Sequence, residues 1–155
     1  MIYILSAPIQ SGKTSLLINW SASRKDLYGI LTPVVNGHRV FMNAQTKEQF
    51  PMEASGEEET LVVGRFVFSK AGFDKAIQII REAIHHEGWL IIDEVGPLEL
   101  RGEGFCNVLK EVVAVRKKKI ILVVREGMAE QVKTYFGIDE ASVINNMQEV
   151  TTGKG

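Results

Sequence analysis

The segment that most constrains how this chain can fold lies near its amino end, between an apolar run and a helical pattern. Residues 2–5 are apolar and rich in β-forming side chains, and residues 13–23 have the apolar spacing of a helix. Between them, residues 7–14 read Ala-Pro-Ile-Gln-Ser-Gly-Lys-Thr, which matches the pattern G-x-x-x-x-G-K-[ST] with alanine at the first glycine position. A buried strand that turns into a helix through such a loop predicts an α/β fold.

This strand, loop and helix have the arrangement that binds phosphate, the Walker A motif. Successive backbone N–H groups of such a loop turn toward one anion, and the helix N-terminus adds the positive end of its dipole. Gly12 lets the backbone approach the phosphate, Lys13 is expected to bridge the β and γ phosphates in catalysis, and the Thr14 hydroxyl is expected to ligate Mg²⁺. The residues predicted to surround the phosphates are Ala7, Pro8, Ile9, Gln10, Ser11, Gly12, Lys13, Thr14 and Ser15.

The rest of the chain alternates between short apolar runs and amphipathic helical patterns. Strands are predicted over residues 27–35, 61–68, 89–92, 120–124 and 142–145, and helices over residues 73–86, 104–116 and 127–136. Such alternation predicts a mostly parallel sheet with helices on its faces, and ligands bind such sheets at the carboxyl ends of the strands. Asn36-Gly37 predicts a β-hairpin that adds an antiparallel element, and residues 44–60 are expected to be irregular.

A second motif follows the apolar run at residues 89–92. This run ends in Asp93-Glu94, and an apolar strand that ends in aspartate is the Walker B pattern. We expect Asp93 to face the phosphate loop and to hold Mg²⁺, through a water molecule. Glu94 is then placed to orient or deprotonate an attacking water, which favours hydrolysis over a simple nucleotide switch.

Phosphoryl transfer concentrates negative charge on the γ-phosphate, so a cationic side chain is also expected near it. Arg125 follows directly after the predicted strand 120–124 and is the favoured candidate. Arg39, on the hairpin, and Arg65, on the predicted strand 61–68, are alternatives, whereas Arg101 is interpreted as a solvated loop residue.

Composition excludes several other classes of protein. The 155 residues carry a formal net charge of −1, which gives no overall attraction to nucleic acid or anionic membranes, and the basic run Arg116-Lys117-Lys118-Lys119 is interpreted as a solvated loop. The only cysteine, Cys106, lies in a helical pattern and is expected to be buried and inert. No signal peptide or membrane span is expected. We predict a single cytoplasmic domain over residues 1–155.

Four stretches of the chain also carry a family resemblance. They are residues 7–14, residues 29–32 running into residues 37–41, residues 64–66, and residues 93–100, which read Asp-Glu-Val-Gly-Pro-Leu-Glu-Leu. Together they resemble the small P-loop nucleoside-triphosphatases first described from thermophiles, to which the cancer-related nucleoside-triphosphatase belongs. The resemblance implies a RecA-like core and slow Mg²⁺-dependent hydrolysis of ATP, GTP and other nucleoside triphosphates to diphosphate and phosphate.

Two alternatives remain open at this point. The same phosphate loop could serve a kinase, in which Glu94 acts on the hydroxyl of a nucleoside or another small acceptor. It could also serve a nucleotide-dependent switch or binding module with negligible turnover. Phosphate release without an acceptor distinguishes hydrolysis from the first alternative, and stoichiometric nucleotide retention marks the second.

Overall fold

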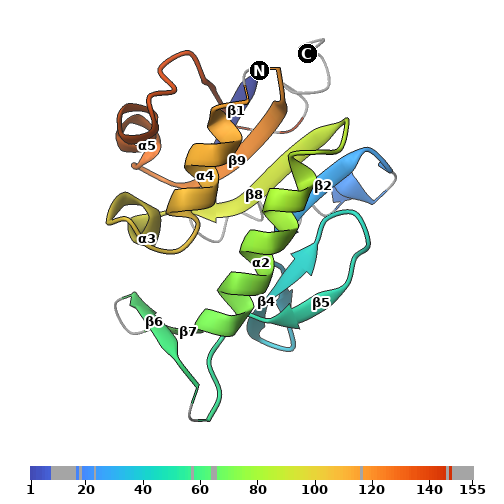
Figure 1. Cartoon of the computed structure of the whole chain (residues 1–155), viewed down its shortest axis with the longest axis vertical. Coiled ribbons are helices and arrows are strands. Elements are labelled where there is room, and N and C mark those ends of the chain that lie inside the picture. The colour runs from blue at the N-terminus through green and yellow to red at the C-terminus, as the bar shows by residue number, and fades with distance from the viewer. Residues whose placement is uncertain are drawn as a thin grey trace.

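The protein is built around one large, mostly parallel β-sheet (Figure 1). The structure is a computed structural model that describes residues 1–7, 17, 19–22, 24–56, 58–63, 66–115, 117–145 and 147. The strand order is β10 (Ser142–Ile144), β1 (Ile2–Ala7), β9 (Lys119–Arg125), β8 (Trp89–Val95), β2 (Leu27–Leu31), β4 (His38–Asn43) and β3 (Val34–Val35), and β5 (Gln49–Pro51) also pairs with β4. The strands from β10 to β2 run parallel, and β4 pairs with β2 in the antiparallel sense.

Both faces of this sheet are covered, as the continuous apolar runs of β8 and β9 require. One core cluster joins alternate sheet residues to apolar residues of α2 (Lys70–Ala83), α4 (Cys106–Val113) and α5 (Ala129–Phe136). Figure 1 shows α2 and α4 lying across the near side of the sheet. The second cluster uses the other alternate residues and includes Leu17, which is helical, as are residues 19–21. The strands between these layers therefore point their side chains into apolar surroundings on both sides.

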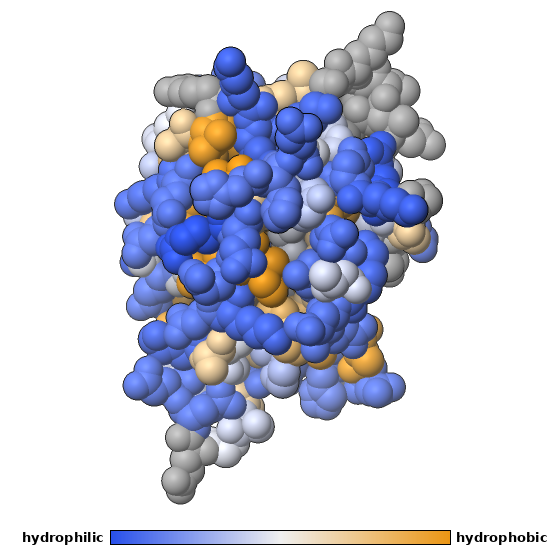
Figure 2. Space-filling model, turned by 45° about the vertical axis from the view of Figure 1, so that its right-hand side comes forward, coloured by the Kyte–Doolittle hydropathy of each residue, from blue (hydrophilic) through white to orange (hydrophobic). Residues whose placement is uncertain are grey.

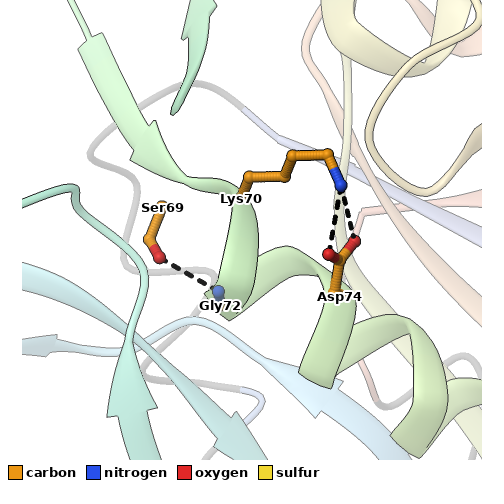
Figure 3. Close-up of polar contacts among 4 residues, drawn as sticks. All are labelled: Ser69, Lys70, Gly72 and Asp74. Atoms are coloured by element: carbon orange, nitrogen blue, oxygen red, sulfur yellow. Dashed lines mark hydrogen bonds and ion pairs between the residues drawn. The ribbon is translucent and has the colours of Figure 1, made fainter. Parts of the chain in front are cut away.

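Helix α2 begins where its sequence supplies a cap. The Ser69 hydroxyl accepts a hydrogen bond from the Gly72 amide at 3.0 Å, and Lys70 pairs with Asp74 one turn later at 3.1 Å (Figure 3). A Cβ atom at Gly72 would collide with the carbonyl oxygen of Pro51, so glycine allows the helix to lie close to β5. The helix therefore starts three residues before the predicted Phe73, and it ends at Ala83.

The predicted hairpin at residues 36–37 is confirmed. Val35 pairs with His38, and both residues of the turn have positive φ, 52° for Asn36 and 80° for Gly37. Asparagine and glycine are the residues that adopt this conformation most readily, which explains why the chain reverses at this point. The predicted antiparallel element is therefore present beside β2.

Three predictions about strands are wrong. Residues 27–35 do not form one strand: β2 ends at Leu31 and the chain pairs again only at β3, because Pro33 has no N–H group to continue a ladder. Residues 61–68 form an antiparallel hairpin of β6 (Thr60–Val63) and β7 (Phe66–Ser69), a separate two-stranded sheet at the foot of Figure 1. Residues 44–60 are not wholly irregular, since they contain β5.

The other predicted elements are present with shifted ends. β8 continues to Val95 and β9 to Arg125, so the residues expected just beyond these strands lie within them. Helices α4 and α5 are shorter than predicted, and a one-turn helix, α3 (Pro97–Leu100), follows β8 without having been predicted. Cys106 is buried, as expected. The face shown in Figure 2 is mostly hydrophilic with small separate apolar patches, and no helix among the described residues has the length and hydrophobicity to cross a membrane.

Candidate functional site

The carboxyl ends of four neighbouring strands bring the predicted site residues to one edge of the sheet. β9 lies between β1 and β8, and its last residue, Arg125, pairs with Ala7 at the end of β1. On the other side of β9, Asp93 pairs with Val123. β2 then ends beside β8, so that Thr32 reaches Asp93. The start of the phosphate-loop motif and the Walker B aspartate are therefore separated by a single strand.

Most of the phosphate-loop motif lies outside the residues that the structure describes. Residues 8–15, which include Lys13 and Thr14, belong to this part of the chain, and Ala7 is described as the last residue of β1. Two observations frame the motif: β1 ends at Ala7, and helical residues begin to be described at Leu17. The roles assigned to residues 8–15 stay predictions.

Asp93 is fully buried at this edge, which is an unusual place for a carboxylate. Its Oδ2 atom accepts a hydrogen bond from the Thr32 amide at 3.2 Å, whereas Oδ1 has no hydrogen-bond partner among the described residues. Burial and, to a smaller extent, the nearby charge of Glu94 together raise the pKa of Asp93 to about 6, although the Thr32 amide and the charge of Arg39 act to lower it. A cation at this edge would therefore stabilise the ionised form of Asp93.

Thr32 is a site residue that the motifs did not identify. It is buried, and its Oγ1 atom, like Asp93 Oδ1, has no partner at hydrogen-bond geometry within the described part of the chain, although the hydroxyl lies near enough to Asp93 to lower the pKa of that carboxyl group slightly. A buried hydroxyl and a buried carboxylate oxygen that both lack partners are uncommon in folded proteins. The sequence offered two signals: Thr32 ends the stretch 29–32 that carries part of the family resemblance, and Pro33 ends the β2 ladder just after it.

Glu94 lies at an irregularity in the β8 ladder. Asp93 pairs with Val123 and Val95 with the next residue, Val124, so Glu94 is the extra residue of a β-bulge. Its side chain is half-buried, and its negative charge raises the pKa values of both Asp93 and Glu99. Bulges often redirect a side chain next to an active site. At this bulge, Glu94 does not follow the regular alternation of side chains between the two faces of the strand.

The structure separates the four arginine candidates. Arg125 lies at the site edge with its Nε atom buried and without a hydrogen-bond partner in the described chain. Arg39 lies close enough for its charge to lower the pKa of Asp93. Arg65 is outside the described residues. Arg101 is exposed, as interpreted, but it also donates to the Val62 carbonyl at 2.5 Å and pairs with Glu103 at 2.7 Å.

Glu99 is a third carboxylate near this edge, and the motifs assigned it no role. It is buried in α3, and burial raises its pKa to about 7, with a smaller contribution from the charge of Glu94. The charge of Glu94 acts on both Asp93 and Glu99, which lie within seven residues of the chain, and the charge of Arg39 acts on Asp93. No group of three or more His, Cys, Asp or Glu side chains is arranged to hold a metal by itself in the residues described. Such an edge can bind a cation that another ligand, such as a phosphate chain, also coordinates.

Comparison with known proteins agrees with this arrangement. A family model described as NTPase matches residues 2–150. The crystal structure of THEP1 from the hyperthermophile Aquifex aeolicus is similar, with a TM-score of 0.69 and 20% identity over 98% of this chain and 94% of that one. The solution structure of a human cancer-related nucleoside triphosphatase is similar, with a TM-score of 0.68 and 20% identity over 92% of this chain and 87% of that one.

No curated protein sequence matches the chain significantly. The family model covers nearly the whole chain, and the two structural neighbours share its parallel sheet and flanking helices, which is the P-loop fold predicted from the first motif. The chain therefore belongs to the NTPase family, and it is an enzyme that hydrolyses nucleoside triphosphates.

Proposed function

We propose that this NTPase requires Mg²⁺, that Asp93 binds the metal ion, and that Glu94 activates the attacking water. One observation carries the proposal. Asp93 is fully buried at the carboxyl edge of the sheet with one oxygen bonded to the Thr32 amide and the other, Oδ1, without a partner in the described residues. A buried carboxylate with an open oxygen is stabilised by a cation far more than by water.

The residues at this edge fit a magnesium ion. Mg²⁺ prefers oxygen ligands and keeps several of its own waters, so it needs only one or two carboxylates together with substrate phosphates. Asp93 would hold it from the sheet, Thr14 would supply a hydroxyl from the phosphate loop, and the open Thr32 Oγ1 could accept a hydrogen bond from a metal-bound water. When bound, the ion neutralises charge on the β and γ phosphates.

Glu94 is the proposed general base or water-orienting group. It neighbours Asp93 but lies on the bulge, so the two carboxylates need not face the same ligand. With the γ-phosphate held by Lys13, the Glu94 carboxylate would accept a proton from the attacking water, and Arg125 would stabilise the charge that develops on the phosphoryl oxygens. Arg125 Nε, which has no hydrogen-bond partner among the described residues, supports this choice, although Arg39 also acts electrostatically on Asp93.

The test compares Lys13→Ala with Lys25→Ala, a matched change of an exposed lysine outside the motif. Phosphate release from ATP, GTP, CTP and UTP is followed with Mg²⁺ and with chelator, with and without a nucleoside acceptor. We expect release that requires Mg²⁺ but no acceptor, a loss of roughly 100-fold or more in Lys13→Ala, and no change in Lys25→Ala. Full activity of Lys13→Ala would overturn the phosphate-loop assignment, and activity in chelator would overturn the metal requirement.

A further inference from the structure

The carboxylate of Glu99 joins two loops next to the proposed site. Its Oε1 atom accepts a hydrogen bond from the Gly96 amide at 2.8 Å, and its Oε2 atom accepts one from the Phe105 amide at 2.9 Å. Gly96 is the first residue after β8, and Phe105 directly precedes α4. One side chain therefore fixes the exit of the strand that carries Asp93 and Glu94 to the start of the next long helix.

The backbone around Glu99 is shaped to keep this contact. Pro97 has no N–H group, so the Gly96 amide is the last backbone donor before the proline, and it is directed to Glu99. Gly104 has φ of +60° and lies against the carboxylate, where a Cβ atom would collide with Oε2. The Glu103 amide also donates to the Leu98 carbonyl at 2.9 Å, which closes the loop over the side chain. The sequence thus provides a proline, a glycine and a short helix around a single buried carboxyl group.

The ionised carboxylate satisfies both partners best. Two N–H groups face the two oxygens, so a glutamine must present its NH2 group to one of these donors, and a protonated acid offers one of them only its hydroxyl oxygen, a weaker acceptor. The ionised form is nevertheless unfavourable at this position, because burial raises the pKa of Glu99 to about 7. Among the described residues, the charged group that acts on Glu99 is Glu94, whose negative charge adds to this effect. A buried group whose ionisation destabilises the fold does not serve stability, and groups of this kind are frequent at functional sites.

We propose that Glu99 is a positioning residue for hydrolysis, which holds the turn after β8 so that Glu94 keeps its place beside Asp93. The proposal rests on the function proposed above. Glu99 does not touch the substrate in this role, since it is buried and both of its oxygens are occupied by backbone amides. Its effect reaches the site through Val95, the single residue that separates Glu94 from Gly96.

The main test compares Glu99→Gln with Glu103→Gln, a matched change of an exposed glutamate in the same loop. Kinetics with Mg²⁺ and ATP should show kcat lowered by about 10-fold or more in Glu99→Gln, in the range found for residues that orient active-site ligands, with KM changed little. Glu103→Gln should keep the wild-type values. Wild-type kcat in Glu99→Gln would overturn the proposal, as would an equal loss in the control.

The pH dependence separates positioning from a merely structural role. Protonated glutamic acid and glutamine are uncharged, have nearly the same shape and each carry one carbonyl acceptor, so the kcat values of wild type and Glu99→Gln should approach one another below the pKa of Glu99, about 7. The ratio of wild-type to variant kcat should therefore rise from near 1 at acidic pH to its full value above neutrality. A ratio that is constant with pH would indicate a structural defect and overturn the proposal.

Two further measurements cover failure of folding and failure of the proposed function. Gly104→Ala places a methyl group against Oε2 without changing the carboxylate, so it should lower kcat in the same way, and an unchanged kcat would contradict the proposal. In metal-free protein, nuclear magnetic resonance should show faster amide exchange at Gly96 and Phe105 and shifted Glu94 resonances in Glu99→Gln but not in Glu103→Gln. These signals do not depend on catalysis. Absence of Mg²⁺-dependent hydrolysis in wild type would contradict the proposed function, and unshifted Glu94 resonances would contradict the role of Glu99.

Discussion

The two ends of strand β8 satisfy their polar groups in opposite ways. At its amino end, the Trp89 amide donates to the Asp26 carbonyl at 2.7 Å, the N-terminal ammonium group donates to the Lys118 carbonyl at 3.1 Å, and the Lys118 ammonium group donates to the His86 carbonyl. At the carboxyl end, the buried atoms Asp93 Oδ1, Thr32 Oγ1 and Arg125 Nε lack partners among the described residues. In the described part of the chain, we call the amino end of the sheet, where these groups are paired, the saturated edge, and the carboxyl end, where buried polar atoms lack partners, the open edge.

The two ends of β8 also differ in packing and in the pKa values of their buried groups. The Trp89 ring lies 6.0 Å from Tyr3 and 6.3 Å from Trp20 between ring centroids, and only 5% of Trp89 is exposed. At the other end, burial raises the pKa values of two carboxyl groups, so the folded protein tolerates their charge poorly, whereas at the amino edge burial lowers the pKa of Lys118, whose ammonium group has the His86 carbonyl as a partner. Open polar groups and perturbed pKa values cost stability and are found where ligands bind. We infer that the amino edge mainly contributes to the stability of the fold and that the carboxyl edge binds the ligand and carries out catalysis.

The largest effect is expected from a change at the saturated end. Trp89→Ala removes a ring that packs against two aromatic neighbours, and such truncations destabilise proteins by about 3–5 kcal/mol. Chemical denaturation should report this loss. The kcat of the folded fraction, measured well below the melting temperature, should not change. A fall in kcat without a loss of stability would break the comparison.

The next effect is expected at the open end, without a loss of stability. Glu94→Gln keeps the shape of the side chain, so Mg²⁺·ATP should still bind, while single-turnover hydrolysis should slow by roughly 100-fold, as in removal of a general base. Nucleotide titration and denaturation of the same variant provide the controls. Wild-type hydrolysis would contradict the role of Glu94. Transfer to an added nucleoside that is lost while hydrolysis persists would favour the kinase alternative.

The sequence predicted those parts of the fold that depend on local pattern. The apolar runs of β8 and β9 identify central strands because both of their faces are buried, and the place of Asp93 and Arg125 at the carboxyl edge follows from the parallel arrangement. The hairpin at residues 36–37 was predictable because its turn needs two residues that accept positive φ. These features require no knowledge of the order of the strands.

Features that depend on strand order or on very short elements were missed. The contact of Thr32 with Asp93 exists because β2 lies beside β8, and nothing in either segment encodes that neighbour. The reversal between β6 and β7 occurs within a run short enough to be one strand, although Gly64 in its middle was a usable signal. Helix α3 has only four residues, too few for a periodic pattern, so the buried position of Glu99 was not visible.

A smaller effect should appear in the pH dependence of stability. Because the pKa of Asp93 is raised from 3.8 to about 6, the fold favours its protonated form, and the stability that this proton provides is present below pH 4 and is lost as the pH rises through 6. The shift corresponds to at most ~3 kcal/mol. Asp93→Asn still offers an acceptor to the Thr32 amide, so in metal-free buffer its melting temperature should rise relative to wild type between pH 4 and pH 7. If the difference in melting temperature between Asp93→Asn and wild type does not change with pH, the charge of Asp93 is already compensated by neighbouring groups in the folded protein.

The smallest effect, and the one that discriminates best within the open edge, concerns the two arginines. Arg125 ends the strand between β1 and β8 and has an unpartnered Nε in the described residues, whereas the charge of Arg39 already acts on Asp93 in the absence of substrate. A cation that serves only the transition state changes kcat and not ground-state binding. Arg125→Ala should therefore lower kcat about 10-fold or more, on the order of 1.4 kcal/mol, with nearly unchanged nucleotide affinity. Arg39→Ala should mainly raise the pKa of Asp93, which a shift of the melting-temperature profile toward higher pH would report. If Arg39→Ala alone lowers kcat, the transition-state cation comes from the antiparallel arm of the sheet, and the open edge extends beyond the parallel strands.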